Sequence, residues 1–132
     1  MENQPTKTNK EIPTLQFSVP CDGFGRGPNN KPVFVGVFSS ILRPSVIPQF
    51  FILNRWINGL GEFEQRVKIL DLELKQIAQS ELRKFSLDSK AKSADIGEGF
   101  ININFEKSGV YWIVTELDGE SAMSFPMPVF NK

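Results

Sequence analysis

The chain has no histidine and only one cysteine and one tyrosine among its 132 residues. Without histidine it cannot form a Ser-His-Asp triad or a Cys-His pair, and it has no imidazole to bind a metal ion. Hydrolases of those types are therefore excluded. The lone Cys21 cannot form a disulfide within the chain, which fits a reducing cytoplasm, and we expect the protein in that compartment.

Net charge is missing as well, because 15 basic and 15 acidic residues cancel at pH 7. No overall field therefore favours nucleic acid or an anionic membrane. No apolar run approaches the roughly 18 residues of a membrane-spanning helix, and the polar first residues contain no apolar stretch of the signal-peptide kind. We expect neither nucleic acid nor a membrane as a partner.

Phenylalanine is abundant instead, with twelve residues against two tryptophans and one tyrosine. Phe has no polar group to suit a wet binding surface, so this bias indicates an aromatic core. Residues 1–13 are polar and are predicted to form a disordered tail, because they cannot bury enough apolar area to offset the entropy of ordering. Residues 14–132 are predicted to form a single β-sandwich domain.

The stretch from Phe105 to Phe130 indicates the fold most clearly. Apolar side chains alternate on both sides of Asp118 and Gly119, a dipeptide that favours a tight turn between two strands. Pro126 and Pro128 lack N–H groups that would point to the same edge of the last strand. That strand should therefore border its sheet, with its proline side toward solvent.

Further strands are predicted over residues 15–21, 33–41, 49–58, 62–71 and 100–105, with loops over 22–32 and 90–98. Residues 33–41 are apolar in both phases at their start, which favours a central strand covered on both faces, and Gly36 suggests a bulge or a close neighbour. Residues 73–86 stay open: their apolar spacing fits an amphipathic helix, while a strand over 82–87 competes. The fold class is all-β, an antiparallel sandwich of about seven to eight strands.

Three short motifs resemble an uncharacterised family of small, mostly bacterial proteins with an immunoglobulin-like β-sandwich fold. They are Val19-Pro20-Cys21-Asp22 leading to Lys31; Gly36-Val37-Phe38 with Ile41, Pro44 and Pro48 before Phe50 and Phe51; and Gly109, Tyr111, Asp118 and Gly119. The resemblance implies a fold but no reaction and no catalytic residues. The chain departs from it at Ser39, where an acidic residue is expected, and over residues 73–86.

Several residue groups are candidate sites, each with a plainer interpretation. Cys21 shares a phase with Phe17 and Val19, which predicts a buried and inert thiol. The glycines at 23, 25 and 27 lack the Lys-Ser/Thr ending of a phosphate-binding loop, so a plain loop is expected, although Arg26 and Lys31 would allow an anion contact.

Two acidic groups also favour the plainer interpretation. Glu116, Asp118 and Glu120 are too few for a calcium site and are interpreted as a solvated hairpin tip. Asp88, Asp95 and Glu98 have no supporting pattern for acid–base catalysis. We expect no catalytic residue, no metal site and no cofactor.

Tyr111 and Trp112 lie on opposite faces of the strand that follows Gly109. Tyr111 resembles the tyrosine corner of immunoglobulin-like sandwiches, whose hydroxyl group bonds back to the main chain. Trp112 shares its face with Val110 and Val114; if open to solvent, these three residues form an apolar patch of the kind that marks a partner surface. Cover by a helix, a loop or a second copy is the alternative.

Two functions follow as hypotheses. The first is a non-enzymatic interaction or structural module that binds a partner protein or itself, which the expected fold and the missing catalytic chemistry favour. The second is a small-ligand binder or weak enzyme that uses loops at one end of the sandwich, with Arg26, Lys31, Arg43 and the acidic residues 88–98. The fold alone cannot decide between them.

Overall fold

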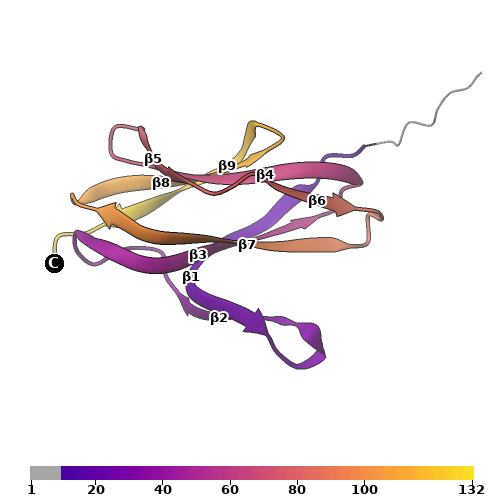
Figure 1. Ribbon diagram of the computed structural model, residues 1–132, viewed down its shortest axis with the longest axis horizontal. Helices are drawn as coiled ribbons and strands as arrows, with labels where there is room; N and C mark the ends of the chain where they lie inside the picture. The colour runs from indigo at the N-terminus through magenta and orange to yellow at the C-terminus, as the bar shows by residue number, and fades with distance from the viewer. Residues whose placement is uncertain (1–9) are drawn as a thin grey trace, which may run out of the picture.

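Two antiparallel β-sheets pack face to face in residues 10–132, the part of the chain that the computed structural model describes (Figure 1). The first sheet contains β1 (Thr14–Arg26), β2 (Pro32–Val37), β3 (Ser45–Ile57) and β7 (Ser93–Phe105), in the order β2-β1-β3-β7. The second contains β4 (Gly61–Leu70), β5 (Gln76–Gln79), β6 (Arg83–Leu87), β8 (Gly109–Leu117) and β9 (Glu120–Val129), in the order β5-β4-β8-β9, with β6 also paired to β4. These nine strands confirm the predicted all-β sandwich.

The closing hairpin is confirmed. β8 and β9 pair from Gly109 opposite Val129 to Leu117 opposite Glu120, and the turn places Asp118 and Gly119 at positive φ values of 50° and 85°. β9 borders its sheet, as its two prolines predicted. The segment at Ile41 covers part of that border: the Ile41 N–H group donates a hydrogen bond of 2.9 Å to the Pro128 carbonyl, and the Ile41 carbonyl accepts one of 2.8 Å from the Phe130 N–H group.

The second half of β1 and the whole of β2 form a separate ribbon, residues 22–37. β1 changes direction near Cys21, and the ribbon folds back under the first sheet, at the bottom of Figure 1. Two aromatic pairs fix its inner face, since the Phe24 ring meets Phe51 edge-on at 5.3 Å and the Phe34 ring meets Phe17 at 5.7 Å. The ribbon therefore covers part of the outer surface of the first sheet.

The ribbon corrects two predictions. Residues 22–32 were expected to be a loop, but Asp22–Arg26 continues β1, and only the short 3-10 turn η1 (Pro28–Asn30) and its flanks connect it to β2. The strand predicted over 33–41 was expected to be central, but β2 ends its sheet and stops at Val37. Its valines face outward because Phe34, in the opposite phase, packs against the sheet.

Residues 73–86 form no helix. β5 and β6 pair in turn with the same edge of β4, and Ser80 joins them by hydrogen bonds to both main-chain groups of Val67, at 2.8 and 2.9 Å. Leu74 has a φ of 64°, which no α-helix tolerates, and its side chain is 64% exposed. The helical expectation was wrong because β4 offers main-chain partners, and the competing strand over 82–87 is found as β6.

The loop expected over residues 90–98 is also wrong in part, because β7 begins at Ser93 and pairs with β3 along its whole length. The alternation predicted over 100–105 breaks at Asn102, whose φ is 54°. Phe100 and Phe105 consequently both face the core, whereas Ile101 is 65% exposed. The left-handed conformation of Asn102 therefore changes which alternate side chains of β7 face the core on its two sides.

Part of the predicted tail is placed. Residues 1–9 lie outside the described residues, but the main chain of Glu11 exchanges two hydrogen bonds with Leu60, at 2.8 and 2.9 Å. Main-chain pairing with the rest of the domain therefore begins before Thr14. Within residues 10–132 we find no helix with the length and apolarity needed to cross a membrane.

Candidate functional site

The Trp112 patch lies on the outer face of the second sheet. Tyr111 and Ile113 point into the core, at 3% and 0% exposure, so the residues between and beside them point outward. Val110 is 44% exposed, and Trp112 and Val114 are half-buried. Cross-strand pairing extends the surface: Trp112 stands between Leu70 on β4 and Pro126 on β9. We define the Trp112 patch as Leu70, Val110, Trp112, Val114 and Pro126.

No further layer of the described chain covers this patch. In Figure 1 the second sheet forms the upper layer, and the β4–β5 turn, the β8–β9 turn and the start of the described chain rise above it. An ion pair lies beside the patch, where Lys68 Nζ and Glu116 Oε2 approach to 2.9 Å. An apolar centre next to a charged edge is the composition of a protein-binding surface.

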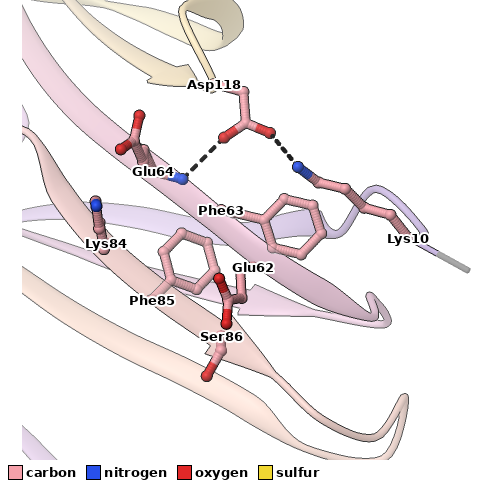
Figure 2. Close-up of a pocket in the computed structure, with 8 residues that line it drawn as sticks. All are labelled: Lys10, Glu62, Phe63, Glu64, Lys84, Phe85, Ser86 and Asp118. Atoms are coloured by element: carbon pink, nitrogen blue, oxygen red, sulfur yellow. Dashed lines mark hydrogen bonds and ion pairs between the residues drawn. The ribbon is translucent and has the colours of Figure 1, made fainter. Parts of the chain in front are cut away.

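A hollow of about 540 Å³ opens where β4, β6 and the β8–β9 turn meet the N-terminal segment (Figure 2). The rings of Phe63 and Phe85 form its apolar wall, and charged side chains surround them. Lys10 enters from one side, where its Nζ lies 3.2 Å from Asp118 Oδ2 and 4.9 Å from the centre of the Phe63 ring. The other Asp118 oxygen accepts a 2.9 Å hydrogen bond from the Glu64 N–H group. The full lining is Lys10, Glu62, Phe63, Glu64, Lys84, Phe85, Ser86 and Asp118.

A buried polar network crosses the interior between two apolar clusters. The Gln65 side chain is its centre: its Oε1 accepts hydrogen bonds from Trp56 Nε1 at 2.8 Å and Asn54 Nδ2 at 3.1 Å, and its Nε2 donates to Glu98 at 2.9 Å. Glu98 is 1% exposed and takes two further bonds from the Arg83 guanidinium, at 3.1 and 3.3 Å. The donors named here all have acceptors, but the Asn54 Oδ1 atom is buried without a hydrogen-bond partner among the described residues, so the network is not fully satisfied. Sequence reasoning missed it, and the only signal was Gln65 interrupting an apolar phase.

Cys21 is buried as predicted, with 0% exposure. It pairs with Val37 on β2 and with Phe51 on β3, and Phe51 packs against Phe24 of the ribbon. The bulge between Leu15 and Phe17 turns the following residues to the other face of the strand. Burial raises the pKa of the thiol, which leaves it protonated and unreactive.

The glycines at 23 and 25 belong to β1, so they do not form a phosphate-binding loop before a helix. Arg26 Nη1 lies 3.7 Å from Asp95 Oδ2, and Arg55 holds the same carboxylate with bonds of 2.6 and 2.8 Å. The Arg55 hydrogen bonds lower the pKa of Asp95. Arg43 lines a different hollow of about 410 Å³ near Asp22, so the basic residues predicted for a ligand site do not converge.

The two acidic groups are dispersed. Glu116 pairs with Lys68, and Asp118 pairs with Lys10, while Glu120 is exposed. Asp88 pairs with Lys92 on the surface at 3.2 Å, whereas Glu98 is buried. Within the described part of the chain, no three residues of the His, Cys, Asp or Glu types gather as metal ligands do.

Tyr111 has the main-chain contacts expected of a structural lock. Its hydroxyl group donates to the Lys107 carbonyl at 3.1 Å and accepts from the Lys107 N–H group at 3.2 Å. Its ring packs edge-on against Phe105 at 5.0 Å. The residue therefore ties the end of β7 to the start of β8.

Comparison with known proteins gives a family without an assigned activity. A family model described as a family of unknown function, DUF6941, matches residues 16–130. No curated protein matches the chain. The match covers both sheets and every surface described above apart from Lys10.

Proposed function

This chain belongs to the family of unknown function DUF6941, and we propose that it acts as a non-enzymatic protein-interaction module. The observation that carries the proposal is the Trp112 patch, an apolar sheet face over which the described chain places no further layer. Water-exposed valine and tryptophan cost free energy that a protein partner would recover by covering them. Tryptophan at the centre of such a face is typical of an interaction hot spot.

The same proposal retains the finer expectations. An immunoglobulin-like character is supported by the Tyr111 lock and by the antiparallel sandwich. A bacterial origin rests on the resemblance alone. A cytoplasmic location is supported by the buried, unpaired Cys21.

Affinity capture with matched variants tests the proposal. The wild-type chain, Val110→Lys and the control Lys92→Glu are used in parallel to capture proteins from a lysate of the native host. Lys92 lies on an exposed turn away from the patch, and its ion-pair partner among residues 10–132 is Asp88. We expect one co-purifying protein that the control retains and Val110→Lys loses. A partner set that is empty, or equal for all three proteins, would contradict the proposal.

A small-ligand role is the second candidate, favoured by the hollow of Figure 2 with its two phenylalanine rings and its surrounding charges. A ligand there would raise the melting temperature of the wild-type chain. The substitution Phe85→Ala would remove that rise, although it also removes stacking on Trp56. Lys84→Ala, which leaves both rings in place, should weaken an anionic ligand alone.

A further inference from the structure

The outward face of the ribbon is apolar and flat. Val33, Val35 and Val37 lie on it at 45%, 59% and 61% exposure. The residues opposite Val35 and Val33 are Gly23 and Gly25, and a Cβ atom added at either would meet nothing within 4 Å. Neither glycine has the positive φ that favours this residue. Bare strand main chain of this kind suits the close approach of another chain.

β2 is less protected than the other terminal strands, although it begins with Pro32 and carries Gly36 at a φ of 67°. β9 carries Pro126 and Pro128, β5 has only four residues, and β7 carries Asp95, Glu98 and the left-handed Asn102. The sequence of β2, Pro-Val-Phe-Val-Gly-Val, contains no charge. Within residues 10–132 nothing pairs with its second edge.

The main-chain pattern of β2 is suited to pairing with itself. The Lys31 carbonyl points toward β1, where it accepts a 2.7 Å hydrogen bond from the Gly27 N–H group. Because main-chain groups of successive residues alternate between the two edges of a strand, the N–H and C=O groups of Val33 and Val35 also point toward β1. The Phe34 N–H and C=O groups, the Pro32 carbonyl and the Gly36 N–H group then point to the open edge. Pro32 can supply a carbonyl there but no N–H group, so each Pro32 position makes one hydrogen bond across the open edge rather than two.

We propose that two copies of this chain pair through antiparallel β2 strands related by a two-fold axis at Phe34. The two Phe34 residues exchange both main-chain hydrogen bonds, and each Gly36 N–H group donates to Pro32 of the other copy. Val33 of one copy lies beside Val35 of the other on the outward face. The first sheets of the two copies join into one continuous sheet.

Charge supports a second copy as the occupant. The charged residues of the ribbon are Asp22 at its base and Arg26 and Lys31 at its tip. An antiparallel pair places the basic tip of each copy toward the acidic base of the other. No like charges oppose each other along the strand, since β2 has none.

Sedimentation velocity over a concentration series tests the pairing, with Val35→Lys as the variant and Val46→Lys as the control. Both substitutions place a lysine at an exposed strand valine, but only the first lies on β2. We expect a wild-type dimer, a dissociation constant raised at least about tenfold by Val35→Lys, and no change with Val46→Lys. Circular dichroism confirms that both variants fold.

Hydrogen exchange gives a second readout that folding defects do not imitate. The amides of Phe34 and Gly36 should become more protected as protein concentration rises. A wild-type monomer at tens of micromolar, or a dimer that Val35→Lys leaves intact, overturns the inference. Either result leaves the Trp112 patch proposal untouched, because that patch lies on the other sheet.

Discussion

Tyr111 contributes to stability through one hydroxyl group with two main-chain partners. Substitution by Phe keeps the ring against Phe105 and removes both bonds to Lys107. We expect Tyr111→Phe to lower the free energy of unfolding by about 1 kcal/mol, measured by urea denaturation. Tyr111→Leu, which also loses ring packing, should cost more. An unchanged urea midpoint for Tyr111→Phe would contradict the structural role.

Asp95 should make stability depend on pH in the acid range. Hydrogen bonds from Arg55 lower its folded pKa below the ordinary value of 3.8. A lowered folded pKa gives stabilisation that is present above 3.8 and is lost as the pH falls through the folded pKa. Asp95→Asn should therefore be less stable than wild type at pH 7, and the gap should narrow below about pH 4.

Measurement of urea midpoints at several pH values checks this. Asp71 also has a lowered pKa, from the N–H groups of Lys75 and Glu73, so the wild-type curve alone cannot isolate Asp95. The difference between wild type and Asp95→Asn removes that contribution. A difference that stays constant from pH 7 to pH 3 would sink the prediction.

The ribbon packs against the first sheet at Gly97. A Cβ atom at Gly97 would overlap the Phe24 ring, whereas one at Gly25 would meet open space. Gly97→Ala should therefore push the ribbon outward and destabilise the fold by about 1 to 3 kcal/mol. Gly25→Ala, the same change within the ribbon itself, should stay within about 0.5 kcal/mol. Equal melting temperatures for the two variants would contradict the packing.

The existence of a strand followed from sequence where apolar residues alternate, as in β4, β8 and β9, or form a nearly continuous run, as in β3. The prediction failed where pairing with a strand distant in sequence decides the secondary structure. Residues 73–86 carry helical spacing, but their neighbours along the chain do not reveal that β4 has an unpaired edge to fill. Asn102 likewise exchanges two faces of β7 through a single backbone angle. Periodicity records local preference, and tertiary pairing overrides it.

At the scale of the whole molecule, some candidate sites could be predicted from sequence and others could not. The Trp112 patch was predictable because strand alternation alone separates Tyr111 from Trp112. The hollow of Figure 2 was not, since it joins Lys10, Phe63, Phe85 and Asp118 from four distant segments. The ribbon was hidden for a similar reason, because a bend at Cys21 places Phe24 over Gly97. The part of a site that lies on one strand, such as Val110, Trp112 and Val114, can be predicted from sequence, whereas Leu70 and Pro126 join the patch only through long-range pairing.

Association of the two sheets depends on the buried Glu98, which connects β7 of the first sheet to Gln65 on β4 and Arg83 on β6. Arg83→Met leaves its carboxylate without a cation. We expect a loss of about 2 to 3 kcal/mol, less than for a fully buried pair because the Arg83 side chain is 47% exposed.

A second substitution separates this charge effect from lost packing. Adding Glu98→Gln to Arg83→Met removes the uncompensated charge while an amide can still bond to Gln65, so part of the stability should return. Lys92→Met, which breaks an exposed ion pair with Asp88, should change the urea midpoint little. If the double variant is no more stable than Arg83→Met alone, the unpaired Glu98 charge is not the cause of the lost stability. Arg83 then stabilises the fold through the packing of its aliphatic chain.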